Sequence, residues 1–523
     1  MKKAVHSFLF LLIFMVISCR QEAKSAAPNI IYVLADDLGY GDLGAFNREG
    51  KIKTPHLDQM AQQGMIFTDA HTSSSVCTPT RYGILTGRYN WRSPLKRGVL
   101  IGTSRALIPQ DRTTVPSFLK SNGYHTAFIG KWHLGWDWAL KDNAFQNTTI
   151  KDGEIFEKID FSKKITKSPN GLGFDYAYGH CGSLDMPPYV YVENEKISAP
   201  VQNITARKGD YHWWRKGPTA DDFDHERVTP HLFDKAEAYV TQMNEKEKPF
   251  FLYLPLPSPH TPILPTGEWK GKSGLNPYAD FVMQIDHRLG KLNGLLDELG
   301  ISENTIVIFT SDNGCSPEAK FDVLAEKGHD PSGVFRGHKA DIFEGGHRVP
   351  FIVKWPRKIK AGSVSHKTIC TTDFLATCAD ILGKTLKDEE GEDSFSMMPL
   401  FLEETKNQYK RSFTIHHSIN GSFAIRKGDF KFIFCPGSGG WSFPKPSKKE
   451  TQGLPKFQLY NLKEDPGEIN NLYGQHPKIE HELIFLFKEA IQKGRTTKGI
   501  PQKNFSTYFS TKKWEPLAVF EGE

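Results

Sequence analysis

YADFVMQIDHRLGKLNGLLDELG, residues 278–300, is followed after three residues by NTIVIFTSDNG, residues 304–314. The first stretch repeats apolar residues on one helical face, namely Phe281, Val282, Ile285, Leu289, Leu292, Leu296 and Leu299. The second contains a short apolar run that is typical of a buried strand, as does KPFFLYLPLPSPH, residues 248–260. Strand, helix and strand at these lengths predict a βαβ unit. The expected fold class is therefore α/β, with parallel strands and helices on the faces of the sheet.

Earlier segments repeat these patterns. NIIYVL, residues 29–34, predicts a buried strand that stops at Asp36-Asp37, and HTAFIGKWHLG, residues 125–135, predicts a strand that ends near Lys131. TPHLDQMAQQG, residues 54–64, has a threonine cap, a proline in its first turn and a terminal glycine, as a helix should, and TTVPSFLKSNG, residues 113–123, is similar. Residues 136–245 are rich in aromatic, glycine and charged residues, and we expect long insertions there.

The C-terminal part has a different pattern. FAIRKGDFKFIF, residues 423–434, alternates and turns at Lys427-Gly428-Asp429, which predicts a β-hairpin. Residues 456–472 predict a strand, a turn and a return, and residues 476–494 predict an amphipathic helix. We therefore expect a large domain over 29–404 and a smaller α+β domain over 405–523.

The N-terminus predicts export. Lys2 and Lys3 precede the apolar run FLFLLIFMVI, residues 8–17, which is too short to span a bilayer and is typical of a secretory signal. VISC, residues 16–19, resembles a lipoprotein cleavage site, so we expect a signal peptide over 1–19, lipidation of Cys19 and a polar tether over 20–28. The alternative is an ordinary signal peptide that is cut nearby. The prediction is a protein that is anchored in the bacterial cell envelope by its lipid alone.

Charge and cysteine content exclude some functions. The chain carries a formal charge of +6, and its first nineteen residues contribute two lysines and no acid. The remaining +4 is too dilute for a nucleic-acid-binding protein but suits an anionic ligand. Apart from Cys19 and Cys77, five cysteines remain, an odd number, and none has zinc-site spacing. We expect no complete disulfide framework, and Cys370 and Cys378 are predicted core thiols in a helical stretch.

Polar residues follow the predicted strands at four points: Asp36-Asp37, Lys131-Trp132-His133, His260 and Asp312-Asn313. In open α/β sheets, ligands bind beyond the carboxyl ends of the strands. The aspartate and asparagine side chains offer only oxygen ligands, which favours Ca²⁺ or Mg²⁺. Lys131, His133, His260 and the later Lys339 add cationic or proton-donating groups. A metal beside these groups suits a phosphate or sulfate ester.

CTPTRYGILTG, residues 77–87, predicts a helix that begins near Cys77, because Pro79 suits its first turn. The helix N-terminus favours an anion beside Cys77. Arg81 lies about one turn later and can face the same site. The alternative is a buried cysteine ahead of an ordinary helix.

This segment, with Arg88, resembles the signature of the type I, formylglycine-dependent sulfatases, with Thr80 where that family often has serine or alanine. Further similar segments are ADD at 35–37, GKWHLG at 130–135, PSPHTP at 257–262, SDNG at 311–314, GHKADIFEGGHRVP at 337–350 and LYNLKEDPGEINNL at 459–472. The resemblance covers roughly residues 28–475. It implies an alkaline-phosphatase-like fold, a large mixed sheet flanked by helices with a smaller C-terminal α+β domain. The implied activity is hydrolysis of sulfate esters.

The resemblance also implies roles for individual residues. Cys77 would be oxidised to formylglycine (3-oxoalanine) by a formylglycine-generating enzyme or an anaerobic maturase. Its hydrate carries two hydroxyl groups, one to attack sulfur and one to expel sulfate. The implied ligands of one Ca²⁺ ion are Asp36, Asp37, Asp312, Asn313 and modified Cys77. Arg81, Lys131 and Lys339 would hold the formylglycine and the sulfate. His133 would assist deprotonation of the hydrate or elimination of sulfate, and His260 would protonate the leaving oxygen.

The substrate is expected to be a sulfated polysaccharide fragment, from an algal glycan or a glycosaminoglycan. GHCGSLD, residues 179–185, loosely matches a family segment with a sulfate-contacting serine, which points to Ser183. Aromatic and basic residues suit sulfated sugars, so the predicted sugar contacts are His180, His212, Trp213, Arg215 and His338. An ordinary packed loop is the alternative for 211–231. Two other functions remain open: a phosphatase or phosphodiesterase of the same superfamily, and a glycan-binding lipoprotein without catalysis.

Overall fold

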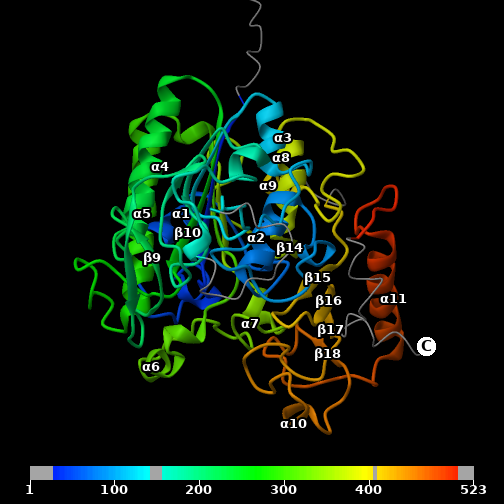
Figure 1. The fold of residues 1–523 in the computed structure, drawn as a ribbon. Helices are drawn as coiled ribbons and strands as arrows, with labels where there is room; N and C mark the ends of the chain where they lie inside the picture. Colours follow the sequence, from blue (N-terminus) through cyan, green and yellow to red (C-terminus); the bar gives the residue numbers. More distant parts are fainter. Residues whose placement is uncertain (1–26, 142–155, 404–408, 505–523) are drawn as a thin grey trace, which may run out of the picture.

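A computed structural model describes residues 27–141, 156–403 and 409–504 of the protein (Figure 1). The predicted signal peptide with Cys19, most of the tether and the predicted domain boundary at 404–405 lie outside the described residues. Among the helices of the described part, none combines the length and the apolar character that crossing a bilayer requires.

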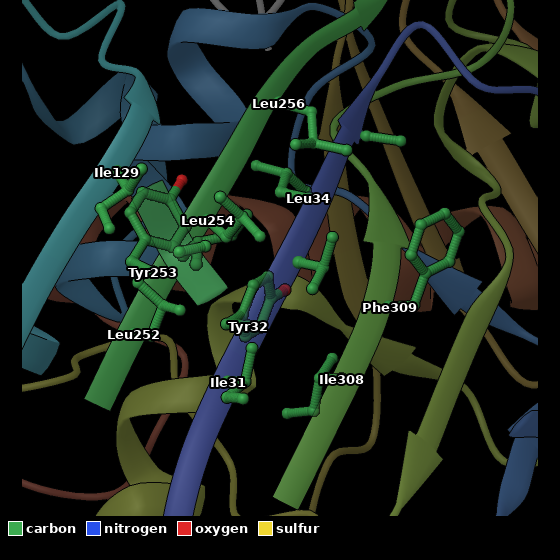
Figure 2. Packing of buried hydrophobic residues seen from close by; sticks show 14 of the residues in the cluster. Ile31, Tyr32, Leu34, Ile129, Leu252, Tyr253, Leu254, Leu256, Ile308 and Phe309 are labelled. Carbon is green, nitrogen blue, oxygen red and sulfur yellow. The ribbon is translucent and has the colours of Figure 1, made fainter. Parts of the chain in front are cut away.

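A ten-stranded mixed sheet forms the centre of the molecule, in the order β13-β2-β12-β11-β1-β10-β4-β5-β6-β7. Its five central strands are parallel: β11 (Thr305–Ser311), β1 (Asn29–Asp36), β10 (Phe250–Pro259), β4 (His125–Lys131) and β5 (Tyr176–His180). Figure 2 shows the apolar side chains of β1, β10 and β11 packed together. These strands read as continuous apolar runs because helices cover both faces of the sheet.

Shorter strands extend the sheet at both edges. β12 (Phe351–Lys354) pairs antiparallel with β11 and with β2 (Met65–Phe67), and β13 (Ser363–Ser365) pairs parallel with β2. At the other edge, β6 (Val192–Glu193) and β7 (Lys196–Ile197) are antiparallel. The parallel core, with antiparallel pairs on both sides of it, confirms the predicted α/β class and the large mixed sheet.

Helices cover the two faces in two groups (Figure 1). One group is α1 (Pro55–Gln63), α4 (Val228–Glu245) and α5 (Pro277–Glu298), and the other is α2 (Cys77–Thr86), α3 (Val115–Ser121) and α8 (Phe374–Ile381). The predicted helices at 54–64, 113–123 and 278–300 are confirmed. α5 links β10 to β11, as the βαβ prediction required. The two strands are not adjacent, however, because β1 pairs with both.

The region that was expected to hold insertions is more ordered than its composition indicates. Its described part contains α4 and a two-stranded hairpin outside the main sheet, β8 (Val201–Arg207) with β9 (Trp214–Ala220). Other short strands and α-helices of the described residues are β3 (Ala70–His71), α6 (Phe321–Glu326), α7 (Glu344–His347), β14 (Ile369–Cys370), α9 (Met398–Phe401) and α10 (Lys448–Thr451).

The C-terminal part forms a four-stranded antiparallel sheet of β15 (Thr414–His417), β16 (Phe423–Lys427), β17 (Phe430–Ile433) and β18 (Gln458–Asn461). α11 (Pro477–Lys493) packs against β16 and β17, so the predicted hairpin and final helix are confirmed. The predicted return after β18 is not a strand. The Asp465 carboxylate accepts hydrogen bonds from the backbone N–H groups of Ile469 and Asn470, which are therefore unavailable to a β-ladder.

The cysteines behave as expected with one exception. All six in the described residues are free thiols, and Cys370 and Cys378 are fully buried. Cys378 lies in α8, but Cys370 ends β14 and is not helical, because it pairs with β3 before the helix begins.

Candidate active site

The predicted metal-binding residues meet the predicted catalytic lysine and histidine at the carboxyl ends of the central strands. Asp36 ends β1 and Asp37 follows it, Asp312-Asn313 follows β11, Lys131 ends β4, and His260 follows β10. These strands are parallel neighbours, so their carboxyl ends lie together. The backbone N–H of Asp37 donates to Asp312 Oδ1 at 3.3 Å, which joins the ends of β1 and β11 directly.

Acidic side chains and Cys77 form a buried cluster at these strand ends. Asp36, Cys77 and Asp312 have potential ligand atoms that all lie within 4.8 Å of one another, as have Asp36, Asp37 and His260. Asn313 Nδ2 donates to Asp37 Oδ1 at 2.7 Å. Asp36 Oδ1 and Asn313 Oδ1 are buried without a hydrogen-bond partner. Buried polar atoms are normally hydrogen-bonded. Two buried oxygen atoms without a partner, in a cluster rich in oxygen, are therefore suitable ligands for a hard cation.

Three cations neutralise the three carboxylates of this cluster. Arg81 donates to Asp312 Oδ2 from Nε at 3.0 Å and from Nη2 at 2.8 Å. Lys131 forms an ion pair with Asp36, and Lys339 Nζ lies 2.7 Å from Asp37 Oδ1. Burial would raise the pKa of Asp36, but Lys131, His260 and Arg81 hold it well below its usual value. Burial and the neighbouring Asp36 carboxylate raise the pKa of Asp312, a repulsion that a bound cation would relieve.

Cys77 is the first residue of α2, as predicted, and Val76 before it is extended. Burial raises the pKa of the Cys77 thiol to about 11, although Lys131 and Lys339 act in the opposite direction. A neutral thiol is a poor nucleophile. The raised pKa therefore makes the unmodified Cys77 thiol a weak nucleophile near neutral pH.

Two histidines present one ring nitrogen each to the cluster. His133 Nε2 donates to the carbonyl of Leu100 at 2.7 Å, which leaves Nδ1 buried, unpartnered and able to accept a proton. Burial, Lys131 and Arg81 hold the pKa of His133 well below its usual value. His260 Nδ1 donates to the carbonyl of Thr261 at 2.6 Å, and its Nε2 lies 3.7 Å from Asp37 Oδ2.

Comparison with known proteins agrees with this geometry. A sulfatase family model matches residues 28–384, and a model of the C-terminal region of N-sulphoglucosamine sulphohydrolase matches residues 335–496. The chain belongs to the sulfatase family. It is 32% identical over 507 residues to the N-acetylgalactosamine-6-O-sulfatase of Bacteroides thetaiotaomicron, with 89% of this chain and 94% of that protein covered. Human arylsulfatase A is 32% identical over 477 residues, with coverage of 89% and 87%.

Solved structures support the same assignment. A structure from work on the metabolism of multiple glycosaminoglycans by B. thetaiotaomicron is 31% identical, with a TM-score of 0.76 and coverage of 89% of this chain and 99% of that one. Phosphonate monoester hydrolase of Agrobacterium radiobacter, 16% identical with a TM-score of 0.55, shares the fold. The alkaline-phosphatase-like fold and the predicted enzyme class, a sulfuric ester hydrolase, are thus confirmed. The matches favour a sulfatase over the alternative phosphatase.

Two predicted substrate residues of the sulfatase lie at the end of β5, the strand next to β4, and just after it: His180 is the last residue of β5, and Ser183 follows in the next turn. His180 pairs with Lys131 in the register of the two strands. His180 Nδ1 donates to the carbonyl of Gly182 at 2.8 Å, while its Nε2 and the Ser183 hydroxyl are buried and unpartnered. Burial and Lys131 lower the pKa of His180 to about 3, so its ring is neutral. Both side chains are therefore available to a neutral or anionic ligand.

The contacts described for the remaining predicted sugar-binding residues are with residues outside the acidic cluster. Trp213 Nε1 donates to Glu318 Oε2 at 3.2 Å, and Arg215 pairs with Asp185, two residues after Ser183. His338 Nδ1 lies 3.0 Å from the carbonyl of Lys339. His212 lines a separate hollow of about 560 Å³ with Arg207, Ile263 and Leu264. Among the described contacts, none joins the His212 ring to the acidic cluster, because the β8–β9 hairpin directs it to this hollow.

Two supporting residues, Ser311 and Tyr278, were not among the predicted site residues. Ser311 Oγ accepts from the Leu38 N–H at 3.0 Å, and the Tyr278 hydroxyl donates to the carbonyl of Asp37 at 3.1 Å, so both hold the turn after β1. Asp37 itself has φ of 67°, a conformation that aspartate tolerates better than most residues. The available signal for Ser311 was its place in the SDNG segment, residues 311–314, directly before Asp312.

A second buried cluster, His71, His347 and His416, also has nitrogens within 4.8 Å of one another. Their nitrogens are paired, however: His71 Nδ1 with His347 Nδ1 at 3.1 Å, and His347 Nε2 with Lys431 Nζ at 3.1 Å. His416 Nδ1 lies 3.0 Å from the carbonyl of Thr72, and its Nε2 lies 2.9 Å from Thr414 Oγ1. The cationic Lys431 inside the cluster opposes a metal. This network joins the segment before Cys77 to the C-terminal sheet.

Proposed function

We propose that this sulfatase removes sulfate groups from sulfated glycosaminoglycan-type oligosaccharides, using a formylglycine made from Cys77 and one Ca²⁺ ion. The observation that carries the proposal is the buried grouping of Cys77, Asp36 and Asp312, with two unpartnered oxygens beside it. The glycosaminoglycan class is favoured over an algal glycan because the N-acetylgalactosamine-6-O-sulfatase of B. thetaiotaomicron matches this chain over most of its length.

Calcium fits the donor set and the charge of the site. Asp36, Asp37, Asp312, Asn313 and modified Cys77 would hold it through oxygen. The three carboxylates are already balanced by Arg81, Lys131 and Lys339. A divalent cation would leave an excess of two positive charges, which suits a sulfate ester and the sulfate that is released.

Modification of Cys77 explains why a deeply buried thiol occupies this position. In the maturation step the Cβ–S bond is replaced by C=O: water supplies the oxygen, sulfide leaves, and two electrons pass to the oxidant of the maturation enzyme. Dioxygen can accept both electrons; without oxygen, an organic radical of the maturase would remove one hydrogen atom and a second one-electron acceptor of that enzyme would take the other electron. The hydrated aldehyde supplies one hydroxyl for attack on sulfur and a second for expulsion of sulfate.

The surrounding residues would orient the ester and move protons. Arg81, Lys131 and Lys339 would bind the sulfate oxygens once the metal shares their carboxylate partners. His133 would accept a proton at the buried Nδ1, since its Nε2 is held by Leu100. His260 would donate a proton from Nε2 to the leaving sugar oxygen, since its Nδ1 is held by Thr261.

The proposed setting is the bacterial cell envelope. Export through the N-terminal signal and lipidation of Cys19 would place the enzyme where oligosaccharides arrive from outside. The membrane would be contacted only through the lipid, and nucleic acid is not a partner.

The test uses the chain co-produced with a formylglycine-generating enzyme. Sulfate and phosphate release are measured on a panel of defined sulfated oligosaccharides and matched phosphate esters, and the Cys77 peptide is analysed by mass spectrometry. We expect sulfate release, an aldehyde at position 77, and loss of activity in Cys77→Ala. Full activity with an unmodified thiol, or faster phosphate release, would contradict the proposal.

A further inference from the structure

The loop between β17 and β18, residues 434–457, exposes two aromatic side chains. Trp441 is 42% exposed and Phe443 is 65% exposed. Of the tryptophans that the structure describes, Trp441 alone is exposed to this degree. The cost of leaving large aromatic rings in water makes neighbouring exposed aromatics a common mark of a binding surface.

A buried carboxylate fixes this loop to the active-site segment. Asp341 Oδ1 accepts the backbone N–H groups of Trp441 at 2.8 Å and Ser442 at 3.0 Å. Asp341 Oδ2 accepts the N–H of His338 at 3.0 Å. Lys339, which lies between His338 and Asp341 in the chain, forms an ion pair with Asp37 of the acidic cluster. One side chain therefore sets both the position of the aromatic loop and the backbone that carries Lys339.

The backbones of the two segments also touch. Ile342 N–H donates to the carbonyl of Ser438 at 2.8 Å, and Ala340 N–H donates to the carbonyl of Ser75, two residues before Cys77, at 2.8 Å. A Cβ on Gly440 would lie 2.4 Å from the carbonyl oxygen of Ala340, so only glycine permits this approach. The loop is thus built against the wall of the active site.

The loop is strongly basic and borders a hollow. Within 436–456 it carries Lys445, Lys448, Lys449 and Lys456 against the single acid Glu450, a net charge of +3. Lys445 Nζ lies 5.0 Å from the centre of the Phe443 ring. Ser442 and His338 together line a hollow of about 260 Å³. Apolar rings beside ammonium groups match a sugar ring that bears sulfate or carboxylate groups.

We propose that the β17–β18 loop binds a second, anionic sugar residue of the same oligosaccharide whose sulfate is being removed. Trp441 and Phe443 pack against the sugar ring, and Lys445 with the neighbouring lysines pairs with its anionic groups. This deepens the proposed function and rests on it, since the occupant is the remainder of that substrate. The enzyme then favours longer anionic chains over single sugars.

The test compares two substrates that carry the same scissile sulfate, a monosaccharide and a hexasaccharide of the repeating unit. We expect the ratio of kcat/KM on the hexasaccharide to that on the monosaccharide to fall about tenfold in Trp441→Ala and Phe443→Ala, chiefly through KM. Lys445→Ala lowers the ratio in the same direction and makes it less dependent on salt. The matched controls are Phe485→Ala, an aromatic that is 62% exposed on α11, and Lys478→Ala on the same helix.

The outcomes separate this inference from the proposed function. No sulfate release from either substrate by the mature wild type contradicts the proposed function itself. Sulfate release with an unchanged ratio in all three loop variants overturns the role of the loop alone. A ratio that falls equally in Phe485→Ala and Lys478→Ala also overturns it. Binding of the hexasaccharide to Cys77→Ala, measured by calorimetry, should weaken on addition of Trp441→Ala, and equal affinity again counts against the loop.

Discussion

At the scale of single residues, Arg81 has the most demanding environment in the site. It is fully buried and binds Asp312 with two nitrogens. Its Nη1 donates to the carbonyl of Lys131 at 2.8 Å, so one guanidinium connects α2 to the ends of β11 and β4. Only a planar fork satisfies acceptors in these directions at once, whereas lysine offers a single point charge.

We therefore predict that Arg81→Lys lowers kcat/KM for sulfate ester hydrolysis by about 100-fold or more, because the sulfate and Asp312 lose their fixed donor. The measurement is sulfate release by mature enzyme at several substrate concentrations. Arg112→Lys is the control. Arg112 Nη1 lies 2.9 Å from Glu392 Oε1, and neither residue belongs to the acidic cluster. An Arg81→Lys variant with near-normal activity would show that charge alone suffices.

Asp286 on α5 provides a prediction about pH. Its carboxylate accepts the N–H groups of Leu57 at 2.7 Å and His56 at 3.3 Å, at the start of α1. Burial raises the pKa of Asp286 to about 6, although these two N–H groups act in the opposite direction. An unfolded aspartate titrates near pH ~3.9, so the native state binds the proton more tightly. The contribution of Asp286 to the free energy of unfolding is therefore most favourable below its pKa in the unfolded chain, and it is lost as pH rises through about 6.

Asp286→Asn removes this titration. We expect the free energy of unfolding of the wild type, relative to the variant, to fall by about 2 kcal/mol between about pH 4 and pH 7. Denaturant unfolding of both proteins across this range measures the difference. A difference that stays constant with pH, or that grows as pH rises, would contradict the assignment.

At the scale of elements, a buried ion-pair network joins α7 to the C-terminal sheet. Lys431 on β17 lies 3.1 Å from Glu344 of α7 and 2.9 Å from Glu468 in the turn after β18, and all three side chains are fully buried. Glu468 also accepts the Glu344 backbone N–H at 2.6 Å. Without Lys431, two carboxylates would face each other away from water.

Lys431→Met is therefore expected to reduce the free energy of unfolding by about 3–5 kcal/mol. Lys427→Met on the neighbouring strand is the control, because Lys427 pairs with Glu482 at the surface and its loss should cost under about 1 kcal/mol. Thermal and denaturant unfolding provide the comparison. Similar losses in the two variants would mean that the network contributes little.

At the scale of the whole molecule, the proposed calcium would tie together segments that are far apart in the chain. Its ligands come from the ends of β1 and β11 and from the start of α2. Calcium at about 100 times its Kd would stabilise the native state by about 3 kcal/mol. We predict that a calcium chelator lowers Tm, that added Ca²⁺ restores it, and that Asp312→Asn abolishes both responses. A chelator-insensitive wild type would argue against a resident ion.

The sequence by itself determined the local elements and the residue types of the site. The apolar runs of the predicted strands stop near Asp36, Lys131 and Asp312. The segment of residues 77–87 predicted the start of α2 correctly. These features depend on neighbours in the chain, which periodicity reports directly. Motif resemblance then supplied roles for residues such as His133 and His260, which no pattern of spacing would assign.

Only the tertiary structure decided which of these segments meet. β1 lies between β10 and β11, and this order brings Asp36 to Asp312 across 276 positions of the sequence. Contacts between distant segments also form the His212 hollow, the ion-pair network around Lys431 and the hydrogen bond of the Trp441 backbone to Asp341. The physical reason is that local patterns specify backbone conformation and a buried face, whereas strand order and loop docking are set by packing between distant residues.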